Sequence, residues 1–256
     1  MNKLSFAIDR GGTFTDCLVI NNFTKEEKVV KVLSVNPSAY PDAPTECVRL
    51  GLEWGTKSTI PRGALLPTAM IDEIRIGTTV ATNALLERKG AKFALVVTKG
   101  WKDLLYIGNQ SRSDIFDLSC AAPDMLYDTV VEADERVLLD DNGAIQTPSG
   151  QNVTIRRPLS DDNVRAVLSR VLEKNITGIA VCLLHSATYP QHEIRVAEIA
   201  QSMGFTNISL SHVAGSKMIR AVPRGHSSCA DAYLTPVIAI FVALVIISPH
   251  FSRNGV

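Results

Sequence analysis

The sequence predicts an α/β protein in which antiparallel strands at the N-terminus are followed by parallel β-α-β units. Three short segments of alternating apolar and polar residues lie within the first 35 positions and are joined by tight links. Such alternation is typical of half-buried strands, and such links are typical of an antiparallel meander. Further along, near-continuous apolar runs alternate with segments of helical periodicity, as expected for buried parallel strands with helical crossovers.

The link between the first two strands carries a distinctive pattern. Apolar residues lead to Asp9, two glycines and two threonines follow, and Asp16 opens the next apolar run. Adjacent glycines allow a sharp turn whose N–H groups converge, which suits a phosphate oxygen. Because the two acids repel phosphate, their natural partner is Mg²⁺ carried with a nucleotide. No Walker sequence is present, and an ordinary hairpin turn is the alternative. The predicted phosphate and Mg²⁺ residues are Asp9, Gly11, Gly12, Thr13, Thr15 and Asp16.

A third strand is predicted from Lys28 to Val35, and a proline-rich loop leads from it to a helix. Asp42 can cap that helix, which we expect to run to about Trp54 and to end before Gly55. Glycine and prolines between residues 58 and 68 are typical of a surface loop.

A second informative segment extends from residue 74 to residue 90. Its first three residues are typical of a short strand, and Thr78 or Thr79 can cap a helix that follows. Gly90 is placed where a left-handed C-cap of that helix is expected. Exposed hydroxyls and free N–H groups at a helix start form a good anion site. The alternative is that Thr78, Thr79 and Asn83 only cap the helix and pack.

The middle of the chain predicts a buried parallel strand over residues 93–98 and a short helix over 100–108. The polar loop 109–118 contains Arg112, whose guanidinium can bind a carboxylate, although a solvated arginine is the alternative.

One further strand is predicted over residues 130–138, before a turn at 141–143. It carries the acids Glu132, Asp134 and Glu135, which we interpret as its solvated face and not as a catalytic cluster. Arg136 can neutralise part of their charge.

The last third of the chain predicts a β-α-β unit. Ser160 caps a helix with one apolar stripe, residues 178–184 are a buried strand, Pro190 opens another helix, and residues 205–210 are a strand. His185 lies where the central strand ends, a favourable position for a ligand in an open sheet. It can contact a substrate or simply hold a loop.

Composition limits the function classes. Lysine plus arginine and aspartate plus glutamate both number 26, so the zero formal charge argues against a nucleic-acid or anionic-membrane binder. Five scattered cysteines indicate a reduced, cytoplasmic protein without a structural zinc.

Residues 7–16, Ala-Ile-Asp-Arg-Gly-Gly-Thr-Phe-Thr-Asp, resemble the first phosphate hairpin of the actin, sugar-kinase and hexokinase superfamily. The same string is similar to the start of proteins of the hydantoinase/oxoprolinase family. An arginine at position 10 resembles the ATP-dependent 5-oxoprolinase branch of that family, because the hydantoinase and carboxylase branches usually carry a different residue there. Segments 74–90, 184–193 and 222–236 extend the resemblance, which reaches from Phe6 to about Ile238.

This resemblance implies an actin-like (ribonuclease-H-like) ATPase lobe and ATP- and Mg²⁺-dependent hydrolysis of a cyclic amide, 5-oxo-L-proline, to L-glutamate. It implies a cytoplasmic enzyme of glutathione metabolism whose full-length relatives are homo-oligomers, without nucleic-acid or membrane partners. The alternatives are a subunit of a hydantoinase or an acetone/acetophenone carboxylase-type enzyme, and a non-catalytic binding protein that retained the lobe. Substrate roles are implied for Thr78, Thr79, Asn83, Arg112 and His185.

The resemblance divides the chain into residues 1–212, the family's N-terminal domain; residues 213–238, the start of a second lobe; and residues 239–256, a divergent apolar tail. The abrupt change after Ile238 indicates truncation or a gene-model artefact, and the apolar run is too short to span a bilayer comfortably. A second lobe would carry a second phosphate loop and the adenine pocket, so we expect this chain to be inactive alone.

Overall fold

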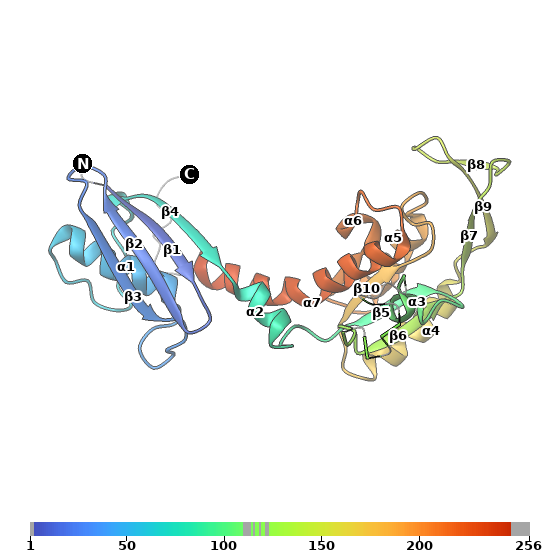
Figure 1. The fold of residues 1–256 in the computed structure, drawn as a ribbon, viewed down its shortest axis with the longest axis horizontal. Helices are drawn as coiled ribbons and strands as arrows, with labels where there is room; N and C mark the ends of the chain where they lie inside the picture. The colour runs from blue at the N-terminus through green and yellow to red at the C-terminus, as the bar shows by residue number, and fades with distance from the viewer. Residues whose placement is uncertain (1–2, 110–113, 115, 118, 121–122, 247–256) are drawn as a thin grey trace. The chain divides into compact units, whose positions relative to one another are not determined.

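The structure is a computed structural model that describes residues 3–109, 114, 116–117, 119–120 and 123–246. The chain forms two compact units (Figure 1). Unit 1 comprises Met1–Lys89 and Val237–Val256, and unit 2 comprises Gly90–Pro236. Parallel and antiparallel sheets are both present, so the predicted mixed α/β class is confirmed.

Unit 1 is built on a four-stranded sheet in the order β3-β2-β1-β4. β1 and β2 pair antiparallel, as do β2 and β3, whereas β1 and β4 pair parallel. The N-terminal meander predicted from the sequence is therefore confirmed. The elements of unit 1 that precede α7 are β1 (Leu4–Arg10), β2 (Phe14–Asn21), β3 (Glu27–Leu33), α1 (Ala43–Thr56), the 3₁₀ helix η1 (Thr68–Met70), β4 (Ile71–Thr78) and α2 (Val80–Leu86).

Helix α1 covers one face of this sheet. Asp42 caps it as predicted, accepting a hydrogen bond from the Thr45 N–H at 2.7 Å. The helix buries an apolar stripe against alternate residues of β1 and β2. It continues through Gly55, where the sequence predicted an end, to Thr56, and the left-handed C-cap is Lys57. Gly55 lies against Leu4, and a Cβ there would be 2.4 Å from Leu4 Cδ1.

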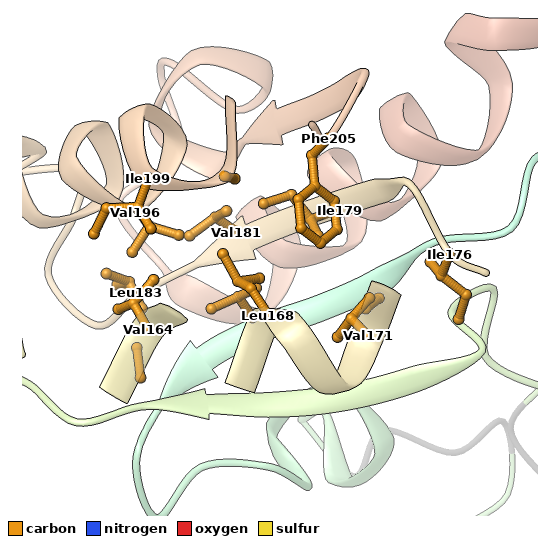
Figure 2. Packing of buried hydrophobic residues seen from close by; sticks show 14 residues of the cluster. Val164, Leu168, Val171, Ile176, Ile179, Val181, Leu183, Val196, Ile199 and Phe205 are labelled. Atoms are coloured by element: carbon orange, nitrogen blue, oxygen red, sulfur yellow. The ribbon is translucent and has the colours of Figure 1, made fainter. Parts of the chain in front are cut away.

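Unit 2 contains an all-parallel sheet in the order β11-β10-β5-β6, which confirms the predicted parallel strands. Helices α4 and α5 supply the core on one face, where Leu168 and Ile199 approach Ile179 and Val181 of β10 (Figure 2). Residues of α3 and α7 pack on the opposite face. The bounds are β5 (Ala94–Thr98), α3 (Leu104–Ile107), β6 (Thr129–Ala133), α4 (Asp161–Leu172), β10 (Gly178–Cys182), α5 (Gln191–Ser202), β11 (Asn207–Leu210) and α6 (Ser211–Ala214).

The single strand predicted over residues 130–138 is wrong. The chain breaks at Asp134–Glu135 into β6, in the parallel sheet, and β7 (Arg136–Leu139), in a separate antiparallel sheet of order β7-β9-β8. The break turns the Glu135 side chain inward, where it is 2% exposed. The remaining strands are β8 (Ile145–Gln146) and β9 (Asn152–Arg157).

Helix α7 (Ala221–Ile246) is long and contains Pro236, the residue at which unit 2 ends. By length and composition alone, Ala221–Ala243 is a candidate membrane span, although a core helix of a soluble protein passes the same test. Cys229, Ala232 and Tyr233 of this helix are buried in unit 2. The expected absence of a membrane partner stays a prediction.

Gly90 does not provide the predicted left-handed helix end. Helix α2 ends at Leu86, and Arg88 has the positive φ of 55°. Gly90 instead lies against the ring of Tyr233, and a Cβ there would come within 2.2 Å of a ring carbon. Position 90 therefore requires glycine because a side chain would clash with Tyr233, and not because the backbone there is left-handed.

Candidate functional site

The predicted strand–turn–strand around the two glycines is present in unit 1. The turn between β1 and β2 is closed by a hydrogen bond from the Gly11 N–H to the Phe14 carbonyl at 3.0 Å. Neither Gly11 nor Gly12 has a positive φ. What glycine provides is room, because a Cβ on Gly12 would lie 3.2 Å from Nδ2 of Asn83.

Asp9 and Asp16 lie directly opposite each other in the β1–β2 ladder. Since opposed residues of an antiparallel pair share a face, both carboxylates lie on the face away from α1. Asp9 is exposed and Asp16 half-buried. Lys31 of β3, the register partner of Asp16, forms an ion pair with it at 2.9 Å. The two acids are thus adjacent, with one cation beside them.

Thr15 has its hydroxyl on the opposite, buried side of the hairpin. Thr15 Oγ1 lies 2.9 Å from Ser34 Oγ, and the Ser34 hydroxyl donates to the Gly11 carbonyl at 2.8 Å. The Ser34 N–H also donates to the Thr13 carbonyl at 2.9 Å. These bonds tie the turn to the end of β3. Sequence reasoning missed Ser34, whose only signal was its place at the end of a predicted strand.

The second motif lies beside the first. Strand β4 runs parallel to β1, with Gly77 opposite Asp9 and Thr78 opposite Arg10. Thr78 Oγ1 donates to the Arg10 carbonyl at 3.2 Å and accepts from the Val80 N–H at 3.2 Å. The structure therefore brings the predicted phosphate hairpin and the predicted substrate segment to one edge of the sheet.

Thr79 and Asn83 belong to the same neighbourhood. The Thr79 N–H donates to the Arg10 carbonyl at 3.3 Å, and Asn83 Nδ2 donates to Thr79 Oγ1 at 3.2 Å. Asn83 is also the side chain that approaches Gly12. Helix α2 has only seven residues, so the hydroxyl and amide groups, not a long helix dipole, determine the polarity here.

Arg10 is half-buried in unit 1. Burial lowers the pKa of its guanidinium, and nearby Asp42 acts in the opposite direction. The guanidinium lies over the Phe241 ring, 5.1 Å from its centroid. Both residues help to line a cavity of about 200 Å³.

The other two predicted substrate residues lie elsewhere. His185 is in unit 2, just after β10, with a positive φ of 60°. Desolvation lowers the pKa of its imidazole, and the positive charges of Arg224 and Arg136 act in the same direction, against Glu135. Arg112 lies outside the residues that the structure describes.

Glu135 is not on a solvated strand face, so that interpretation is wrong. Its carboxylate accepts from the Thr98 hydroxyl and lies 2.8 Å from Nδ1 of His192. Glu132 accepts from the Gly100 N–H at 2.7 Å, and Asp134 pairs with Arg157 at 2.6 Å. The acids of this segment thus hold together the carboxyl ends of β5 and β6, which no local pattern revealed.

A second buried network surrounds Glu193 of α5. Its carboxylate accepts from the Leu183 N–H at 2.9 Å, the Ser211 hydroxyl at 2.6 Å and the His212 N–H at 3.1 Å. Nδ1 of His212 lies 2.6 Å from it. Arg224, fully buried, donates to Ser211 and to the Leu183 carbonyl, both at 2.8 Å. This network joins the end of β10 to α5, α6 and α7.

Asp9 and Asp16 are only a pair. Across the described ranges, no group of three or more His, Cys, Asp and Glu side chains is arranged to hold a metal ion. A cation at the two acids would therefore need further oxygen ligands, which nucleotide phosphates and water can supply.

Known proteins resemble this chain over nearly all its length. A sequence profile of the hydantoinase/oxoprolinase N-terminal region matches residues 5–204. 5-Oxoprolinase 1 of Arabidopsis thaliana is 51% identical over 248 residues, and 5-oxoprolinase of Saccharomyces cerevisiae is 45% identical over 253 residues. The alignments cover 94% and 92% of this chain but 20% of each relative, so the chain spans about a fifth of their length.

A solved structure shares the fold. The ATP-dependent caprolactamase from Pseudomonas jessenii superposes with a TM-score of 0.71 at 23% identity, over 94% of this chain and 33% of that one. At this identity the likeness concerns the fold alone. The profile match and the sequence identities decide the family: the chain belongs to the hydantoinase/oxoprolinase family and matches the N-terminal region of its 5-oxoprolinase members.

Proposed function

We propose that this chain is the phosphate-binding, N-terminal part of an ATP-dependent 5-oxoprolinase that opens the lactam of 5-oxo-L-proline to give L-glutamate. The identities to two 5-oxoprolinases support the substrate class. Because the chain spans about a fifth of those relatives, the proposal assigns it one part of the activity, the binding of nucleotide phosphates.

The observation that carries the proposal is the pair Asp9 and Asp16, opposed across the hairpin on its open face. Carboxylate oxygens are the ligands that Mg²⁺ prefers, and the adjacent turn offers N–H groups and the exposed Thr13 hydroxyl to phosphate oxygens. Gly12 keeps the space in front of Asn83 free. The residues present therefore fit a phosphate group accompanied by Mg²⁺.

Bound Mg·ATP would supply a phosphoryl group that makes an unreactive amide a better electrophile. In the proposal, Gly12 and Thr13 hold phosphate oxygens and Asp9 and Asp16 hold the hydrated cation. Gly11, also predicted as a phosphate residue, closes the turn instead, because its N–H donates to the Phe14 carbonyl. Such fixed donors contribute by positioning charge, the main source of catalysis in phosphoryl transfer.

Two further residues support the hairpin. Lys31 offsets the repulsion between Asp16 and phosphate, since its ammonium lies 2.9 Å from that carboxylate. Thr15 is predicted as a phosphate ligand, but in the proposal it supports the turn indirectly: its hydroxyl is hydrogen-bonded to Ser34, which in turn donates to the Gly11 carbonyl.

The finer fold assignment belongs to the same proposal. Three antiparallel strands followed by a parallel fourth, in the order β3-β2-β1-β4, support an actin-like lobe for unit 1. The position of Thr78, Thr79 and Asn83 beside the turn supports a role in closing over the substrate or phosphates. The division at residues 212 and 238, the substrate roles of Arg112 and His185, and a homo-oligomeric cytoplasmic enzyme of glutathione metabolism remain proposals.

The test exchanges this chain for the matching fifth of Saccharomyces cerevisiae 5-oxoprolinase and measures 5-oxoproline-dependent ATP turnover. Asp9→Asn and Asp16→Asn should each abolish turnover while leaving the thermal unfolding midpoint near that of the parent. The matched control is Asp72→Asn, an exposed acid of β4 in the same sheet, which should retain activity.

Turnover within a few-fold of the parent in both site variants would contradict a phosphate-binding role and leave the hairpin as an ordinary turn. Assays with hydantoin and acetophenone separate the hydantoinase and carboxylase alternatives. Inertness toward all three substrates in a stably folded chimera would favour the non-catalytic binding protein.

A further inference from the structure

Unit 2 has a cavity of about 340 Å³ that the phosphate hairpin does not use. Its wall includes Lys99, which directly follows β5, and Glu135, which lies two residues after β6. The cavity is therefore at the carboxyl ends of two neighbouring parallel strands. In open α/β sheets this edge is where ligands bind, because loops there diverge and leave a crevice.

The cavity is strongly basic. Four of its six lining residues are cationic and one is acidic; the six are Lys99, Glu135, Arg136, Leu138, Arg156 and Arg157. The one acid is committed elsewhere, since the Glu135 carboxylate bonds to Thr98 and His192 in the interior. Glu135 therefore lines the cavity, but its carboxylate is already hydrogen-bonded to other residues of the protein.

The cations differ in how far they are already paired. Asp134 accepts Arg157 at 2.6 Å and lies 3.6 Å from the Lys99 ammonium. Arg136 donates to the Lys99 carbonyl at 3.1 Å, which fixes its position, but it has no carboxylate partner in the described part of the chain. Arg156 is exposed and likewise forms no ion pair with any residue that the structure describes. Two guanidinium groups thus remain available for an added anion.

We propose that this cavity is a binding site for a small polyanion that presents phosphate or carboxylate oxygens to Lys99, Arg136, Arg156 and Arg157. A guanidinium offers paired N–H donors that match two oxygens of such a group. The volume lies at the lower end of the range for small-molecule sites. The site is independent of the hairpin and of the proposed ATP chemistry.

The test uses the full chain on a soluble fusion partner and titrates inorganic pyrophosphate and glutarate by calorimetry at low ionic strength. Arg136→Gln and Arg156→Gln should each weaken binding by about tenfold, the change expected when one charge-assisted hydrogen bond is lost. Arg220→Gln, which removes an exposed arginine of the same unit outside the cavity, should leave affinity within about twofold, because this side chain does not line the site.

Gly12→Val separates this site from the hairpin. It should leave the Arg136- and Arg156-dependent binding unchanged, even if it abolishes phosphate binding in unit 1. Binding of pyrophosphate alone assigns a phosphate ligand, and binding of glutarate alone assigns a carboxylate ligand. Either outcome supports the proposal. It is overturned if neither probe binds, or if Arg220→Gln weakens binding as much as the cavity variants do. Circular dichroism melts check folding, and Arg156→Gln is the milder variant, because that exposed side chain forms no ion pair with a described residue.

Discussion

Replacing Glu193 by glutamine tests how strongly unit 2 depends on its buried polar network. The Glu193 side chain is 0% exposed. One carboxylate oxygen accepts from the Leu183 N–H and the Ser211 hydroxyl, and the other accepts from the backbone and ring of His212. Glutamine has the same shape but only one acceptor oxygen. Its NH₂ group must therefore face two donors, whichever way the amide is turned.

The expected cost follows from these contacts. Two hydrogen bonds to an ionised acceptor are lost, each worth about 1.5–3 kcal/mol. Removing one partner of a buried charged network costs about 3–5 kcal/mol, because the remaining polar groups stay desolvated. We therefore expect Glu193→Gln to lower the free energy of unfolding of unit 2 by about 3–5 kcal/mol, a large part of the stability of a typical domain.

The assay is urea unfolding at pH 7 in a Trp54→Phe background. The chain has two tryptophans, Trp54 in unit 1 and Trp101 in unit 2, so the remaining fluorescence reports on unit 2. The control is Glu198→Gln on the same helix, which removes an exposed acid paired with Arg195 and should leave the midpoint unchanged. A midpoint for Glu193→Gln as close to the parent as that of the control would refute the reasoning.

Three further outcomes are expected. Burial by itself raises the pKa of Glu193, but the hydrogen bonds from His212, Ser211 and Leu183 together outweigh it and hold the pKa below its usual value of 4.5. Unit 2 should therefore keep this stabilisation above about pH 4.5 and lose it as pH falls through the lower folded pKa, which the urea midpoint from pH 7 to pH 3 measures. Gly12→Val should prevent Mg·ATP use in the yeast chimera through steric contact near Asn83 and not through backbone strain; unchanged ATP affinity would contradict a phosphate role. Deleting residues from Ala239 onward should raise solubility, because the side chains of Ile240 and Val242 are 65% and 40% exposed. The shortened chain should still show no 5-oxoproline-dependent ATPase activity, and a soluble, active, monomeric 256-residue chain would contradict this expectation.

Local patterns predicted the elements that depend on neighbours in sequence. The hairpin around Gly11 and Gly12, the Asp42 cap and the β-α-β unit from residue 178 to residue 210 are all confirmed, because alternation, capping residues and helical periodicity act over a few positions. The sequence named Asp9 and Asp16 as Mg²⁺ residues, and the register of the hairpin, which only the structure shows, puts them opposite each other.

Long-range contacts account for what the sequence could not predict. The break before β7 depends on His192, 57 residues further along the chain, which draws Glu135 inward. The closeness of Asn83 to Gly12 depends on the parallel pairing of β1 with β4. The role of Gly55 inside α1 depends on Leu4, which leaves no room for a side chain at that position. In each case the deciding partner lies outside the window that a local pattern covers.

Unit 1 is discontinuous in sequence, because its two parts are separated by the whole of unit 2. During synthesis on a ribosome, all residues of unit 2 are made before Phe241, whose ring lies over Arg10. Joining those two residues across an unfolded chain would carry a loop-closure penalty that grows with the logarithm of loop length. Domains generally fold as units while the chain is made, so a unit 2 that has already folded would shorten this loop. We therefore expect the Arg10–Phe241 contact to form only after unit 2 has folded.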